Sequence, residues 1–471
     1  MTSTIAIILL WFGAGLSGTR TALPIISTGQ RIFLFGFFSL ISMYVVAVCF
    51  LYFRSQGSFD QHLVLLVCAV IFLFLVLLCR WFCSLSDYVV RRDSDGSAGG
   101  AKAFPANFLF QVPFILIFVM FFSAYLYRMA LEPMWGWDAL WYWALVAFDI
   151  LGEQEKTFCC FVEHSKDSWL FDAAPHPATS SALLAFPMLG VELGEGLPSL
   201  YWILTFSSLL TMAYGHALSI TFSALFSLVL VTVFASVPLL ENLASSVGYA
   251  EIFVCGSIFA FSVAFGFRTE HRLWILLCCL PLFSLLIIKN TGLILFLIMI
   301  GAAFLQILYD RGISFRLLVG LSAAVILLAF LVVCFLQYLE WPITLGGRTL
   351  EFDVFRSPLV FRNEFHGKVV NQSFSILAVL LALSFAVCFS LITNKKVQPP
   401  FPEQPFLFFS ITGVLGMLLL AQLSTYGFDA GQPLSDTIIS RHSLPLATLI
   451  IMTVPHIYLA ASNGLHGSED S

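Results

Sequence analysis

The sequence predicts an all-α fold, a polytopic transmembrane bundle of about 13 helices. Composition is the first reason: the 471-residue chain is 59% hydrophobic and 10% charged, whereas soluble domains carry roughly 25% charged residues. The second reason is that apolar runs of about 20 residues, enough to cross roughly 30 Å of hydrocarbon, recur along the chain. No polar stretch is long enough to build a water-soluble domain. No basic run or face indicates nucleic-acid binding.

The apolar runs give the predicted helices in chain order. They lie near 4–18, 32–53, 62–82, 108–131, 199–214, 217–238, 251–267, 273–288, 292–309, 317–338, 374–393, 406–425 and 443–461. The first run lacks a preceding positive charge, which favours a membrane segment over a cleaved signal. Residues 181–192 are apolar but too short to cross, and prolines bound them, so we expect a helix lying in the membrane interface.

The chain is predicted to have three parts. Residues 1–92 carry three transmembrane helices, and 93–105 form a cytoplasmic linker whose first residues are mostly Gly, Ser and Asp. Such a composition behaves as a flexible chain. Residues 106–471 form the remaining transmembrane module, and two large loops, 132–198 and 339–372, interrupt it.

Orientation follows from the lysines and arginines, which collect in short cytoplasmic loops. Five groups fall in alternate connections: Arg20 and Arg31; Arg80, Arg91, Arg92 and Lys102; Arg268 and Arg272; Arg311 and Arg316; Lys395 and Lys396. This alternation places the amino terminus and both large loops outside, with Arg54 as the short-loop exception. We therefore expect an integral multi-pass protein whose polar loops face away from the cytoplasm.

The most polar stretch of the chain, Glu132–His176, is the first candidate site. It holds eight Asp and Glu against two Lys, and five aromatic residues within nine positions surround Asp138. Amphipathic rings favour the membrane interface, where partial desolvation would raise the pKa of a carboxylate toward the range of a general base. The simpler interpretation is that Trp137 and its aromatic neighbours form only an interfacial belt.

Other polar residues collect at the predicted outer ends of helices, and ionisable groups at membrane depth are functional by default. They are His176, Tyr249, Glu251, Lys289, Asn290, Arg441 and His442. Simpler interpretations stay open for several of them. Glu251 fits a solvated helix N-terminus and Lys289 a side chain that snorkels to headgroups. Arg441 fits a headgroup anchor, and His176, between two prolines, a rigid turn.

These residues resemble the GT-C superfamily of integral-membrane glycosyltransferases, which use polyprenyl-phosphate-linked sugars. In that superfamily the catalytic aspartate lies in the first large outer loop, and Asp138 within Trp137-Asp138-Ala139 matches it. A His-Pro pair ahead of an interfacial helix is similar to His176-Pro177 before 181–192. The resemblance covers roughly residues 108–461.

Three further segments carry the same resemblance. They are Gly248-Tyr249-Ala250-Glu251, Lys289-Asn290-Thr291-Gly292 and Arg441-His442-Ser443-Leu444-Pro445, with His442 in an aromatic place. The chain departs from the family pattern in three ways. Three helices precede the usual first one, the acid at 251 is Glu, and there is no large outer carboxy-terminal domain.

The resemblance implies transfer of a sugar from a polyprenyl-phosphate donor to a glycan, lipid or protein acceptor. The expected setting is the outer face of a membrane, a bacterial inner membrane in our interpretation. Asp138 would be the base, and in-line attack assisted by this single base predicts inversion, because retention needs a second nearby carboxylate. Lys289 and Arg441, assisted by His442, would bind the donor phosphate. Five others would orient sugar or acceptor: Glu251, His176, Tyr249, Asn290 and Trp137.

No cofactor is required by this pattern. The eleven cysteines lie mostly in apolar runs, where they behave as small hydrophobes. No metal-ligand spacing occurs in the sequence. Carboxylates are abundant, however, so binding of a divalent metal stays an open alternative.

Two other classes of protein stay open. A lipid-linked glycan ligase or polymerase would rely on paired arginines for a pyrophosphate, and Arg348, Arg356 and Arg362 keep that class open. A transporter or flippase would place its charges at mid-membrane. Inverted repeats, which many transporters show, are absent from the sequence.

Overall fold

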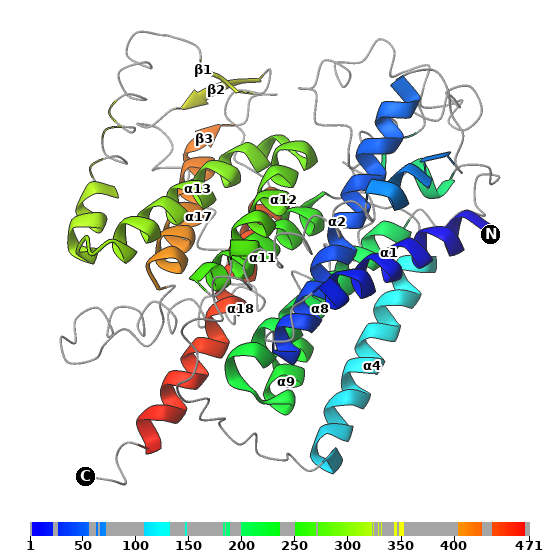
Figure 1. The fold of residues 1–471 in the computed structure, drawn as a ribbon. Coiled ribbons are helices and arrows are strands. Elements are labelled where there is room, and N and C mark those ends of the chain that lie inside the picture. Colours follow the sequence, from blue (N-terminus) through cyan, green and yellow to red (C-terminus); the bar gives the residue numbers. More distant parts are fainter. Residues whose placement is uncertain are drawn as a thin grey trace. The chain divides into compact units, whose positions relative to one another are not determined.

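The computed structural model describes residues 2–21, 27–55, 63–64, 66–71, 108–131, 147, 182–183, 185–188, 199–235, 250–269, 272–322, 324, 328, 331, 343–345, 348–352, 404–425 and 436–466. This part of the chain is helical apart from three short strands (Figure 1). Its α-helices are α1 (Thr2–Thr21), α2 (Thr28–Ser55), α4 (Phe108–Leu131), α8 (Leu200–Thr221), α9 (Ala224–Ala235), α11 (Glu251–Gly266), α12 (Arg272–Ile288), α13 (Asn290–Asp310), α17 (Gln404–Leu423) and α18 (Asp436–His466). Two 3₁₀ helices are η2 (Phe186–Met188) and η3 (Phe267–Thr269).

Membrane-type helices are confirmed, whereas a bundle of thirteen spans is not established. Among the described residues, three helices are long and apolar enough to cross a membrane: Thr28–Phe53, Leu200–Thr221 and Thr291–Asp310. In the other described helices the apolar stretches are shorter, for example Ile5–Thr19 and Leu444–Leu459. The number of spans and the orientation of the chain in a membrane stay predictions.

The chain divides into two compact units, and the boundary falls between Lys289 and Asn290. The first unit contains α1, α2, α4, α8, α9, α11 and α12; the second contains α13, α17 and the strands. Residues of α18 up to Ile457 belong to the second unit and those from Tyr458 to the first. The predicted linker at 93–105 lies outside the described residues. Within the first unit, α1 packs on α2 and α2 packs on α8.

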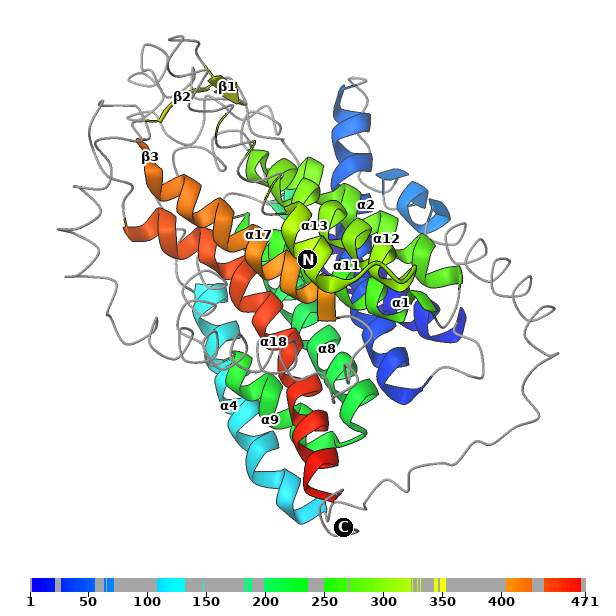
Figure 2. The same ribbon diagram turned by 90° about the vertical axis from the view of Figure 1, so that its left-hand side faces the viewer.

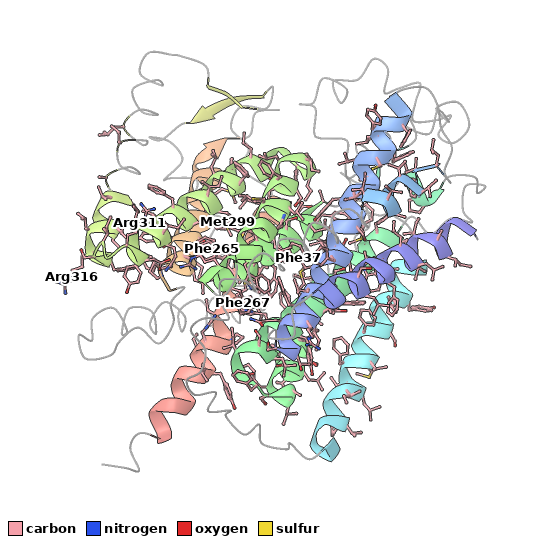
Figure 3. All side chains as sticks on the ribbon, in the orientation of Figure 1. Phe37, Phe265, Phe267, Met299, Arg311 and Arg316 are labelled. Atoms are coloured by element: carbon pink, nitrogen blue, oxygen red, sulfur yellow. The ribbon has the colours of Figure 1, made fainter. Side chains whose placement is uncertain are left out.

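Helix α11 is the centre of the first unit. Every residue from Glu251 to Phe265 is buried, as expected for a helix that is apolar on all sides. The short η3 connects it to α12, and the two helices lie side by side (Figure 2). Aromatic packing closes this end of the hairpin, where the Trp274 ring lies 4.9 Å from that of Phe267. Figure 3 labels Phe265 and Phe267 at this turn.

The predicted break between 214 and 217 is wrong, because α8 runs unbroken from Leu200 to Thr221. Gly215 does not end the helix; it allows α8 to approach α2 closely. A Cβ there would collide with the backbone nitrogen of Phe33, and one at Gly36 would lie 2.7 Å from the oxygen of Ser208. Small residues at such crossings let two helix backbones approach.

Helix α8 ends instead at Phe222, which is left-handed with φ 53°. Ser223 then starts α9, since its Oγ accepts from the Phe226 N–H at 3.2 Å. A serine ahead of an apolar run is a helix-start signal. The sequence therefore contained the correct boundary, eight residues beyond Gly215.

Replacing Gly215 with alanine should destabilise the protein. The added methyl meets backbone rather than a flexible side chain, and overpacking of this kind typically costs about 1–3 kcal/mol. Gly13→Ala on α1 is the matched control, since a Cβ there has no atom within 4 Å and alanine stabilises a helix by about 0.5–1 kcal/mol. Thermal unfolding of the purified variants measures both. Equal melting temperatures for the two variants would contradict the close crossing.

The second unit is built on the pair α13 and α17, which run side by side (Figures 1 and 2). Gln306 of α13 accepts a hydrogen bond from the Phe406 N–H at 2.8 Å and donates one to Asp310 Oδ1 at 2.8 Å. The first turn of a helix leaves backbone N–H groups without intrahelical partners, so Gln306 caps α17 from outside. Beyond α13, Arg311 and Arg316 are both exposed (Figure 3).

The predicted outer loop 339–372 contains strands that the sequence analysis did not predict. β1 (Ile343–Leu345) pairs antiparallel with β2 (Arg348–Phe352), and β2 pairs with β3 (Ser424–Thr425). Leu345 opposes Arg348, so two residues, both glycines in the sequence, separate the strands. A Gly-Gly pair between β-forming residues is a hairpin signal.

The predicted helix at 181–192 is helical where it is described. Residues 182–183 and 185 are α-helical, and η2 follows. Phe186 is fully buried and its ring lies 5.3 Å from that of Phe50 on α2. An interfacial position stays a prediction.

Candidate functional site

The site that the structure describes is an ion pair between two of the predicted residues, Glu251 and Lys289. Lys289 Nζ donates to Glu251 Oε1 at 2.6 Å. The two residues are 38 positions apart in sequence, and the sequence predicted a common outer location without predicting their contact. A lysine–carboxylate contact at 2.6 Å is a charge-assisted hydrogen bond, one of the stronger kinds in proteins.

The hairpin of α11 and α12 explains why these two residues meet. Glu251 is the first residue of α11, after Ala250 in the N-cap position, and Lys289 follows the last residue of α12. Because the helices are antiparallel, the start of one lies beside the end of the other. A carboxylate at a helix N-terminus and an ammonium at a C-terminus are each stabilised by the helix dipole.

Burial decides between the interpretations left open for this pair. Glu251 is 4% exposed and Lys289 is 7% exposed. The structure therefore contradicts both a solvated helix end for Glu251 and a snorkelling side chain for Lys289. Charged groups this deep are found almost only when paired. The pair is consequently an internal feature of the hairpin.

Three buried hydroxyl groups lie farther into the same hairpin. Tyr44 of α2, Ser257 of α11 and Ser284 of α12 are hydrogen-bonded to one another. The sequence analysis missed them because it considered polar residues only at the predicted outer ends of helices. Their signal was visible nevertheless, as polar side chains inside apolar runs, each of which needs a partner when buried.

The structure does not describe the side chains of the other predicted site residues. Arg441 and His442 lie in α18, and Asn290 begins α13, all in the second unit, with side chains outside the described part. The remaining four candidates lie outside the described residues: Trp137, Asp138, His176 and Tyr249.

Among the residues that the structure describes, no group of three or more His, Cys, Asp or Glu side chains could hold a metal ion. The acid-rich stretch 132–176 falls almost entirely outside them. A divalent metal in that stretch therefore stays open.

The fold and the site define a class of protein, a helical chain with membrane-type spans and a buried acid–base pair at the end of a helical hairpin. Comparison with protein-family models, with curated proteins and with solved structures finds no match. The GT-C resemblance thus rests on the residues themselves.

Proposed function

We propose that the chain is an integral-membrane glycosyltransferase that moves a sugar from a polyprenyl-phosphate donor to a glycan, lipid or protein acceptor at the outer face. The observation that carries this proposal is the buried pair of Glu251 and Lys289. It lies at the end of the hairpin that the lysine and arginine pattern assigns to the outer side. A buried ammonium at that depth suits a lipid-linked anion.

The reaction needs one proton acceptor and stabilisation of one leaving anion. Asp138 takes the proton of the acceptor hydroxyl while the hydroxyl oxygen attacks the anomeric carbon from the side opposite the phosphate. The bond between that carbon and the phosphate oxygen breaks, and polyprenyl phosphate leaves with the bonding electrons. One displacement at one face inverts the anomeric centre.

Lys289 has the capacity to stabilise this leaving phosphate. An ammonium has three N–H donors, and within the described residues Glu251 accounts for one of them. The hydrogen bond from Lys289 to Glu251 fixes the direction of the ammonium. Arg441 and His442 are the other phosphate-binding candidates of this proposal, and His176, Tyr249, Asn290 and Trp137 are its candidates for orienting sugar or acceptor.

A charge swap tests the role of Lys289. The variant Glu251→Lys/Lys289→Glu keeps opposite charges on the two helices but moves the ammonium to the other side of the pair. We expect it to stay folded and to bind polyprenyl phosphate roughly ten- to a hundredfold more weakly, since a hydrogen bond to a charged group contributes about 1.5–3 kcal/mol. Titration of purified protein with polyprenyl phosphate measures the dissociation constant.

Lys289→Arg is the control for the swap, because it keeps a cation on the same helix and should retain most of the affinity. If the swapped protein binds polyprenyl phosphate as wild type does, the pair is only a structural link between helices. If wild type does not bind it either, the proposed function is wrong.

The buried pair also favours one other class, because transporters hold paired charges inside helical bundles. A flippase would move fluorescent polyprenyl phosphate between the leaflets of a liposome without consuming it. Sugar transfer to an acceptor without such movement supports the transferase.

A further inference from the structure

We propose that the hydroxyl chain Tyr44–Ser257–Ser284 positions the Glu251–Lys289 pair, and that Tyr44 is the positioning residue contributed by the leading helix α2. The contacts tie three helices together. Tyr44 Oη lies 2.8 Å from Ser257 Oγ, and Ser257 Oγ lies 2.7 Å from Ser284 Oγ. The chain ends on backbone oxygens, with Tyr44 donating to Phe253 O at 2.9 Å and Ser284 to Pro281 O at 2.7 Å.

Proton counting shows that the three hydroxyls act as one unit. Each hydroxyl has one proton to donate, and each of the two hydroxyl–hydroxyl contacts requires one. One proton therefore remains for a backbone oxygen: Tyr44 donates it to Phe253 O, Ser257 donates it to Phe253 O at 3.0 Å, or Ser284 donates it to Pro281 O. Removal of the Tyr44 hydroxyl removes one hydroxyl–hydroxyl contact from every arrangement, and all three residues are at most 4% exposed.

The location of this chain links it to the ion pair. Phe253, which accepts from Tyr44, is two residues after Glu251, and Ser284 is five residues before Lys289. The Phe253 ring is also held by Trp202 of α8, with ring centroids 5.0 Å apart. The first turn of α11 is consequently fixed from both α2 and α8.

Helix α12 needs such a tether because it contains Pro281. A proline removes one backbone hydrogen bond of a helix and weakens its direction beyond that point. Ser284 lies just past the proline, and its contact with Ser257 holds the last turn of α12 against α11. The last turn of α12 therefore places Lys289 beside Glu251.

The test compares two buried tyrosines of the same unit. Tyr44→Phe removes a hydroxyl with two partners, whereas Tyr201→Phe removes one that has no hydrogen bond to any residue the structure describes. Both residues are at most 4% exposed. We expect Tyr44→Phe to lower the melting temperature by about 1–3 °C, and Tyr201→Phe to leave it unchanged or raise it.

A second measurement separates positioning from simple stability. The same tyrosine substitutions are made in a Glu251→Gln/Lys289→Met background, which has no ion pair to position. If Tyr44 positions the pair, the decrease in melting temperature caused by Tyr44→Phe should fall to less than half in that background, because the effects of coupled residues are not additive. The same decrease in both backgrounds overturns the proposal, whatever its size.

Binding gives a third readout, and only this one rests on the proposed function. Tyr44→Phe should weaken the affinity for polyprenyl phosphate about three- to tenfold, while Tyr201→Phe leaves it unchanged. Equal affinities for Tyr44→Phe and wild type overturn the positioning role at the binding site. If wild type does not bind this lipid, the proposed function fails, and the two unfolding experiments still decide whether Tyr44 positions the pair.

Discussion

Substitution of either partner of the buried ion pair alone should lower the free energy of unfolding by about 3–5 kcal/mol. Lys289→Met leaves the Glu251 carboxylate buried without the partner that lies 2.6 Å away, and Glu251→Gln does the same to the ammonium. The attraction between the charges is the smaller part of this effect. The larger part is the cost of keeping a charge in a buried position after its partner at 2.6 Å is lost.

The double variant Glu251→Gln/Lys289→Met should therefore be more stable than either single variant. With both charges gone, neither ion of this pair remains buried, and an apolar or neutral replacement of a buried pair is often neutral or stabilising. Thermal unfolding of the four proteins in the same detergent gives the comparison. Single variants as stable as wild type would show that the pair is open to water in the membrane-embedded protein.

An exposed charge supplies the control for this series. Arg316, beyond α13, is exposed, and Arg316→Gln should change the free energy of unfolding by about 0.5 kcal/mol or less.

The second large effect concerns turnover, which Asp138→Asn should reduce by about 10²–10⁴-fold. Asparagine keeps the volume of the side chain and much of its hydrogen bonding, but it cannot take the acceptor's proton. Affinity for polyprenyl phosphate should stay the same or rise slightly, because a negative charge near an anionic phosphate is lost. Sugar transfer and lipid binding, measured on the same purified protein, separate the two effects.

Asp167→Asn is the matched control, since Asp167 lies in the same acidic stretch without the aromatic cluster that surrounds Asp138. It should be active. If Asp138 instead caps the segment 139–146, its variant would melt at a lower temperature and keep near-normal specific activity. A stable and fully active Asp138→Asn protein would leave the proposed mechanism without a base.

The sequence predicted individual helices well wherever hydrophobic length alone decides them. The run at 108–131 became α4 with the same bounds, and the apolar run at 251 begins α11 at its first residue. A long apolar segment must satisfy its own backbone hydrogen bonds in an apolar setting, and a helix does so locally. The predicted helix boundary near Gly215 was wrong, because a glycine is found both where a helix ends and where two helices pack closely.

The strands at 343–352 were missed in the prediction from sequence. Their Gly-Gly turn is a local signal, but the composition of the whole chain outweighed it in the prediction of an all-helical fold. Short elements contribute little to composition, so only their own turn chemistry could identify them.

The sequence by itself determined that this chain is helical and membrane-like, and it selected Glu251 and Lys289 as residues that need an explanation. Only the tertiary structure decided what each residue faces. The antiparallel packing of α11 on α12 brings the two charges together. Helix α2, which crosses α8 closely, places Tyr44 against α11 in the same unit. The contacts of Glu251 with Lys289 and of Tyr44 with Phe253 join residues 38 and 209 positions apart. Hydrophobic periodicity does not predict such contacts, because they depend on how the helices are rotated and how closely they approach. Hydrophobic length fixes neither of these, whereas side-chain packing and buried hydrogen bonds fix both.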